Sequence, residues 1–246
     1  MIKGWYAVYY REMLIVRRRL PQMVPSMAVS PLLYMMAFGY AMGDQKIVEG
    51  HRYLEFLLPG LIAMSSMVQA FAIASEINIS RFYWNIFEEF QAAPISRTAY
   101  ALGEVLAGVT RAHLSVLIII VMGLPFGVCL AYYNPLFWLG TILNSFVFSA
   151  MAVALAMVVK SHAEQGMLIN FFITPMAFLG GTFFPLDNLP IWIRKPLEFL
   201  PLTHASNAIR ASAFGQNPGY LPYVVLAVTG IVCFLVALNM VGRARD

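Results

Sequence analysis

The residues that could carry out chemistry are few and are scattered along the chain. The four histidines are far apart and form no recognisable metal-ligand motif. The sequence contains no GxxxxGK[ST] phosphate-binding loop, no GxSxG nucleophile turn and no HExxH zinc motif. Cys129 and Cys233 have no histidine or cysteine nearby and are best explained as small apolar side chains. We therefore expect a chain that is not itself catalytic.

Two ionisable residues, Arg111 and His113, stand apart because they lie near the end of a long apolar segment. An ionisable side chain inside a membrane span is expensive to bury and is by default a functional hypothesis. The alternative for Arg111 is that its long side chain extends to the headgroups at the membrane surface. The sequence favours this second interpretation and leaves the first open.

The composition places most of the chain in lipid. Of its 246 residues, 60% are hydrophobic and 11% are charged, and the mean hydropathy is +0.72. Soluble domains are roughly 45–50% apolar and about 25% charged, so this chain has too little polar surface to coat a water-soluble globule. Its net charge of +4 comes from basic residues beside apolar segments. We therefore expect membrane lipids, and no nucleic acid, as partners.

Six apolar segments are long enough to cross the hydrocarbon core as helices, which takes about 20 residues each. They lie near residues 24–42, 57–75, 105–127, 136–159, 167–184 and 220–241. None shows the sustained alternation of a barrel strand. We therefore expect an all-α integral membrane protein with six transmembrane helices. With both termini in the cytoplasm, eleven Lys and Arg residues lie inside and five lie outside, which favours that orientation.

Residues 1–22 precede the first span and have an amphipathic pattern. Trp5, Tyr9 and Met13 recur at helical spacing, and the basic residues lie largely off this stripe. The pattern predicts an amphipathic helix in the membrane interface, or else a solvated cytoplasmic lead-in. The remainder, residues 23–246, is expected to form a single six-span transmembrane domain.

Two connections are too long to be simple turns. Residues 76–104 join the second and third spans on the cytoplasmic side and combine an apolar stripe with flanking charges and Pro94, which ends a helix. A short amphipathic helix across the cytoplasmic face is expected there. Residues 185–219 join the fifth and sixth spans outside, and they are apolar but repeatedly broken by proline. They predict short re-entrant helices in the outer leaflet, whose backbone must be covered by protein.

Three stretches of the sequence resemble the membrane subunit of an ABC-2 type transporter, the permease family of bacterial drug, polysaccharide and lipo-oligosaccharide exporters. Residues 56–61 (FLLPGL) resemble the entry to the family's second span, and residues 88–97 (EEFQAAPISR) resemble its cytoplasmic stretch. The strongest local match is the family signature carried by Pro201, Leu202, His204 and Arg210. Thr182 departs from the signature, which usually has a smaller or aliphatic residue there.

The resemblance implies a non-catalytic half-transporter in the bacterial cytoplasmic (inner) membrane. Two copies, or one copy and a paralogue, would pair with two separate ATP-binding cassette ATPase subunits. No cofactor would bind to this chain, and ATP and Mg would bind to the ATPase. The cytoplasmic helix would be the coupling helix that docks on the ATPase, through Phe82, Ile86, Phe87, Glu88, Glu89, Phe90 and Arg97.

By the same resemblance, the first, second and fifth spans line the interface between the two permeases. Small residues there could allow close approach between chains or could serve packing within one chain: Gly39, Gly43, Ser65, Ser66, Gly180 and Gly181. Met and Phe throughout the spans favour an amphiphilic substrate, which is a drug, a lipid or a lipid-linked glycan, and we expect export. The alternatives are an intramembrane enzyme and a carrier that works without an ATPase.

Overall fold

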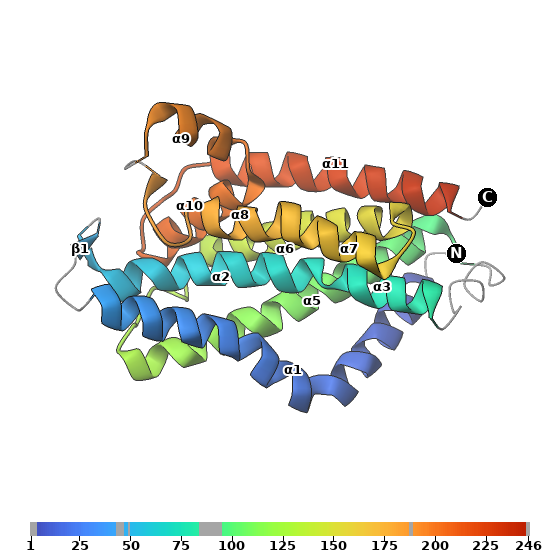
Figure 1. The fold of residues 1–246 in the computed structure, drawn as a ribbon, viewed down its shortest axis with the longest axis horizontal. Coiled ribbons are helices and arrows are strands. Elements are labelled where there is room, and N and C mark those ends of the chain that lie inside the picture. The colour runs from blue at the N-terminus through green and yellow to red at the C-terminus, as the bar shows by residue number, and fades with distance from the viewer. Residues whose placement is uncertain (1–3, 43–46, 49, 84–94, 187–188, 245–246) are drawn as a thin grey trace.

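The computed structural model describes residues 4–42, 47–48, 50–83, 95–186 and 189–244. Long helices lie side by side and run between two ends of the molecule (Figure 1). Helix α1 (Gly4–Met42) begins and α11 (Leu221–Arg243) finishes at one of them, called the terminal end below. The opposite end holds an antiparallel hairpin of two short strands, β1 (Ile47–Val48) and β2 (His51–Arg52). The expected all-α class is confirmed.

Four helical stretches in the described part of the chain are long and apolar enough to cross a membrane. They match the second, third, fourth and sixth segments expected from the sequence. The first comprises α2 (Tyr53–Phe71) and α3 (Ile73–Phe82). The others are α5 (Arg97–Gly123) with the 3-10 turn η1 (Leu124–Phe126), α6 (Pro135–Val158) and α11. The chain is therefore a multi-pass membrane protein.

Helix α1 is a single bent helix of 39 residues (Figure 1). Within the described residues, the expected interfacial helix and the expected first span are two parts of this one helix. Pro21 and Pro25 lie between the two parts. A proline inside a helix removes one backbone hydrogen bond and clashes with the preceding turn, which bends the helix. The division after residue 22 thus falls at a bend and not at a break in the helix.

The fifth expected segment is a helix in three parts. It consists of α7 (His162–Leu168), the π-helical turn η2 (Ile169–Ile173) and α8 (Thr174–Leu179). Gly181, two residues after α8, has φ +75°, a left-handed conformation that glycine adopts without steric cost. Two shorter helices follow at the end opposite the terminal end, α9 (Ile191–Glu198) and α10 (Pro201–Ala213) (Figure 1).

Helix α2 lies at the centre of the bundle and is contacted by α1, α5, α6 and α10. In the most apolar stretch of α2–α3, 83% of the residues are buried, against 22% in α11. A helix that is apolar on every side is expected in such a central position. Helix α11 instead exposes a row of branched side chains that suits a lipid-facing surface: Val224, Val228, Ile231, Val232 and Leu235.

The central helices approach one another closely at Gly108 of α5. A Cβ atom at this position would lie 3.0 Å from the Ser149 Cβ of α6 and 3.1 Å from the Ala70 carbonyl oxygen of α2. Small residues at such crossings let the backbones of membrane helices pack closely. The crossing therefore has no room for a side chain.

Replacing Gly108 by alanine should destabilise the bundle by about 1–3 kcal/mol, because overpacking forces the neighbouring helices apart. The measurement is the midpoint of thermal unfolding in mild detergent. The matched control is Gly166→Ala in α7, where a Cβ atom would have nothing within 4 Å. The control should keep or raise the midpoint, since alanine favours a helix over glycine. An equal fall in both variants would contradict this account of the crossing.

Candidate functional site

A groove opens between α1, α2 and the η2–α8 part of the fifth segment. It encloses a cavity of about 200 Å³. The groove thus joins the three segments that the resemblance expects at the interface between two permeases. Its lining residues come from α1 (Ser26, Met27, Ser30, Pro31 and Tyr34), from α2 (Met64, Ser65, Val68 and Gln69) and from the fifth segment (Ile169, Ile173, Thr174, Ala177 and Phe178).

The lining of the groove is mixed in character. All three helices contribute a hydroxyl group, as with Ser30, Ser65 and Thr174, and α2 adds the amide of Gln69. Ser26 and Tyr34 of α1 carry two further hydroxyl groups, and the other lining side chains are apolar. None of the lining residues carries a charge. Val68 is 38% exposed here, although most of α2 is buried. This surface can contact an apolar chain and can also form hydrogen bonds with a polar group.

Aromatic rings gather beyond the groove, on the side away from the terminal end. The ring of Phe183 lies 5.1 Å from Tyr34, 5.2 Å from Phe38 and 5.3 Å from Phe178, measured between centroids. Tyr34 and Phe178 are also groove residues. Aromatic pairs at these separations attract one another beyond the effect of burial alone. They join α1 to the turn that follows α8.

Arg210 of α10 is buried beside this turn, with 6% of its surface exposed. Its guanidinium donates to the Gly181 carbonyl at 2.6 Å and to the Phe56 carbonyl of α2 at 3.3 Å. It also lies 3.9 Å above the centre of the Phe56 ring, close enough for a cation–π interaction. Arg210 thus joins α10, α2 and the end of α8. A Cβ atom on Gly60 would lie 3.0 Å from this guanidinium.

The other signature residues lie on the same helix. Pro201 begins α10, at a position where its missing N–H costs nothing. Leu202 is fully buried and packs against Gly180. A Cβ atom added to Gly180 would lie 2.7 Å from the Leu202 Cδ2 atom. The His204 Nε2–H donates to the Glu198 carbonyl at 2.8 Å. These contacts connect α10 to α9 and to the fifth segment.

Thr182, which departs from the family signature, is fully buried. Its hydroxyl donates to the Ala177 carbonyl at 3.0 Å. Ser206 of α10 similarly donates to the Gly180 carbonyl at 2.6 Å. The last carbonyls of a helix have no partner within that helix. Thr182 therefore fits here because its hydroxyl satisfies one of them.

The small residues considered for the interface mostly pack within the chain. Gly39 faces Leu54, Gly180 faces Leu202, and Gly181 lies beside Ser206. Ser66 accepts a hydrogen bond from Asn144 of α6 at 2.8 Å. Ser65 differs, because it lines the groove. Gly43 lies outside the described residues.

The Arg111 side chain is largely buried against a neighbouring helix. It is 17% exposed, and its Nη1 lies 3.4 Å from the Glu76 carboxylate of α3. Its Nε–H donates to the Gln69 side chain at 3.3 Å. His113 is packed in the same helix, with Nδ1–H donating to the Val109 carbonyl at 2.8 Å. Arg111 is conspicuous in the sequence as a charge near a span, but its pairing with Glu76 is not, because the two residues lie on different helices.

Most of the expected coupling residues lie outside the described residues. These are Ile86, Phe87, Glu88, Glu89 and Phe90. Phe82, at the last position of α3, is 47% exposed. Arg97 begins α5, and its guanidinium lies near Gly242 of α11. Among the described residues, no group of three or more His, Cys, Asp or Glu side chains could hold a metal ion.

Comparison with known proteins agrees with this architecture. Residues 3–214 match the family model described as ABC-2 type transporter. The chain is 26% identical to the inner membrane transport permease YadH of Escherichia coli (strain K12), over 88% of this chain and 86% of the relative. It is 28% identical to nodulation protein J of Rhizobium leguminosarum biovar viciae, over 98% and 94%. The chain therefore belongs to the ABC-2 type transporter family and is a membrane subunit of an ABC transporter.

Proposed function

We propose that this chain is one of two permeases that together enclose a translocation pathway. The groove between α1, α2 and α8 is the half of the pathway that this chain contributes. The observation that carries the proposal is an open groove on a membrane protein with six polar side chains in its lining. Polar groups within a membrane favour the bundle interior or a cavity over contact with lipid. A second copy or a paralogue, placed against this face, would close the groove.

A six-span topology fits the proposal. Residues 24–42 of α1 and 162–179 of the fifth segment are each about 27–29 Å long at 1.5 Å per residue, close to the thickness of the hydrocarbon core. The start of α1 and the end of α11 lie at one end (Figure 1), as an even number of crossings requires. Arg17, Arg18 and Arg19 favour the cytoplasm for that end. Helices α9 and α10 are then the re-entrant helices of the outer leaflet.

Export needs an energy source, which we assign to separate ATP-binding cassette ATPases that bind ATP and Mg at the cytoplasmic face. This chain has no phosphate-binding loop of its own. Helix α3 ends at Phe82 and α5 begins at Arg97, both at the cytoplasmic end under this orientation. The segment between them combines aromatic side chains for burial with Glu88 and Glu89 for directional contacts. We assign ATPase docking to it.

The exported substrate is an amphiphile, which is a drug, a lipid or a lipid-linked glycan. The groove offers apolar side chains for a hydrocarbon part and hydroxyl and amide groups for a polar part. The location that follows is the inner membrane of a bacterium, surrounded by lipid. The Escherichia coli relative carries this location in its name.

The docking assignment is tested by purifying the tagged protein from its native host in mild detergent. A subunit with a Walker A loop should co-purify and should be lost when Phe87→Ala is combined with Glu88→Gln and Glu89→Gln. The matched control combines Phe199→Ala with Glu198→Gln, an exposed aromatic and acidic pair at the opposite end. The control should retain the ATPase. Purification of the unaltered protein without an ATPase would contradict the proposed function.

The groove is tested by filling it. Ser30→Trp places an indole ring in the cavity, while Val29→Trp places the same ring at the neighbouring exposed position outside the lining. Cells that lack this chain should accumulate an amphiphile, detected by mass spectrometry of membrane extracts. The unaltered chain and Val29→Trp should remove it, and Ser30→Trp should not. Clearance by Ser30→Trp at the normal rate would place the pathway elsewhere.

A further inference from the structure

Four helices contribute to one cluster of charged and polar side chains in the half of the molecule nearer the terminal end. The Glu76 carboxylate of α3 lies 3.5 Å from Arg19 Nη1 of α1 and 3.4 Å from Arg111 Nη1 of α5. Arg111 also donates to Gln69 of α2. Glu76 and Arg111 are largely buried, with 18% and 17% of their side chains exposed, whereas Arg19 is 43% exposed. One carboxylate thus holds two guanidinium groups from two different helices.

The cluster adjoins the groove in two ways. Gln69, which accepts from Arg111, is itself part of the groove lining. On α1, Arg19 precedes Ser26, the first groove residue of that helix, by about 10 Å at 1.5 Å per residue. Pro21 and Pro25 lie between Arg19 and Ser26. The groove wall formed by α1 is thus attached to the cluster through a part of the helix with fewer backbone hydrogen bonds.

The cluster is also attached to the segment assigned to ATPase docking. Glu76 lies on α3, less than two turns before the end of that helix at Phe82. A displacement of α3 along or across the bundle moves the Glu76 carboxylate with it. Arg111 has Gln69 as a second partner, while Glu76 is the partner of Arg19 among the residues that the structure describes.

A second ion-pair cluster fixes the start of α1. Arg11 lies 3.2 Å from the Glu104 carboxylate of α5 and also pairs with Glu12. Both carboxylate side chains are almost completely buried. The first turns of α1 are therefore held against α5, and the proline-containing bend separates them from the groove. Arg19 lies between the fixed part and the bend, so its ion pair with Glu76 meets α1 just before the two prolines.

We propose that Glu76 is a positioning residue that conveys movement of α3 to the groove through Arg19 and Arg111. The proposal rests on the proposed function, because it supplies the route between the ATPase and the pathway. ATP-driven movement at the cytoplasmic end then displaces Glu76 and the α1 wall together. Coupling between two distant sites requires an element that can adopt two arrangements, and we assign this role to the bend in α1.

The test uses a thiol in the groove as a reporter. Cys129→Ser and Cys233→Ala remove the native thiols, and Ser30→Cys introduces one at an exposed groove position. The complex with its co-purified ATPase is labelled with N-ethylmaleimide, with and without ATP and vanadate. The variant with these three changes is the parent for all comparisons. In the parent, ATP and vanadate should change the labelling rate of the Ser30→Cys thiol by about fivefold or more, which is the lower end of typical coupling between sites. Glu76→Gln should abolish that change while the ATPase stays bound.

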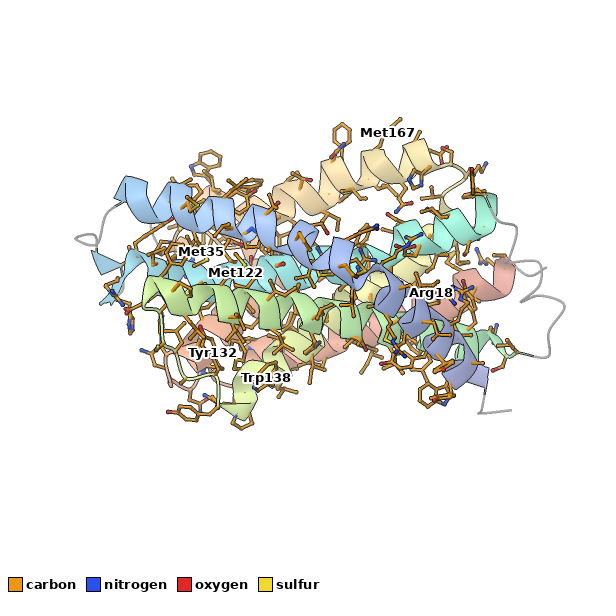
Figure 2. All side chains as sticks on the ribbon, turned by 90° about the horizontal axis from the view of Figure 1, so that it is seen from below. Arg18, Met35, Met122, Tyr132, Trp138 and Met167 are labelled. Carbon is orange, nitrogen blue, oxygen red and sulfur yellow. The ribbon has the colours of Figure 1, made fainter. Side chains whose placement is uncertain are left out.

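Arg18 and Arg19 provide a matched pair on α1. Arg18 is exposed at the neighbouring position, on the part of α1 near the terminal end (Figure 2). Arg19→Gln should reduce the ATP-dependent change as Glu76→Gln does, and Arg18→Gln should leave it intact. Glu76→Asp, which keeps the charge, should retain part of the change. In a double-mutant cycle, Arg19→Gln and Glu76→Gln should be strongly non-additive, and Arg18→Gln and Glu76→Gln should be additive.

The possible results separate the two proposals. Absence of an ATPase from the parent preparation overturns the proposed function. With the ATPase present, a full ATP-dependent change in Glu76→Gln or Arg19→Gln overturns the role of the cluster alone, as does an equal loss in Arg18→Gln. If Glu76→Gln does not fold, Arg19→Gln decides, since that side chain is partly exposed. Without ATP, faster labelling of Ser30→Cys in Arg19→Gln, but not in Arg18→Gln, supports the link to the bend.

Discussion

Lipid offers no hydrogen-bond partner to the backbone, so every helix that stops inside the bundle must have its free carbonyl groups satisfied by protein. The structure depends on how the free carbonyl groups are satisfied where α8 ends. Carbonyl groups at the end of that helix and in the turn after it accept hydrogen bonds from the side chains of Thr182, Ser206 and Arg210. Arg210 also donates to a carbonyl of α2. The same bonds that satisfy the backbone therefore join α2, α8 and α10 into one unit, and α2 and α8 contribute two of the three walls of the groove.

The bundle is largely predictable from the sequence, because each span carries its signal in its own residues. Composition, apolar length and the absence of alternation are sufficient to predict an all-α membrane protein. The shape of α1 is less predictable, since the sequence shows Pro21 and Pro25 but not whether they bend or end the helix. The three-part construction of the fifth segment is not predictable, because a π-helical turn leaves an apolar segment just as apolar.

The candidate site is less predictable than the fold, and the reason is physical. Arg111 attracts attention as a charge within a span, but its partners Glu76 and Gln69 come from other helices and have no fixed spacing from it. Arg210 is found through a family signature, yet it binds backbone carbonyls, which every residue possesses and no sequence pattern reveals. The groove also depends on three segments that are distant along the chain.

The π-helical turn η2 has a consequence for the fifth segment as a whole. Such a turn holds one more residue than an α-helical turn, and one residue corresponds to about 100° of rotation about the helix axis. The turn therefore sets which face of α7 is in line with a given face of α8 along the helix axis. With this offset, Ile173 and Thr174 face the groove while Phe171 and Phe172 are 77% and 62% exposed. If the extra residue moves along the helix, the residues it passes turn to a new face without any break in the chain, so the groove lining can be exchanged by rotation.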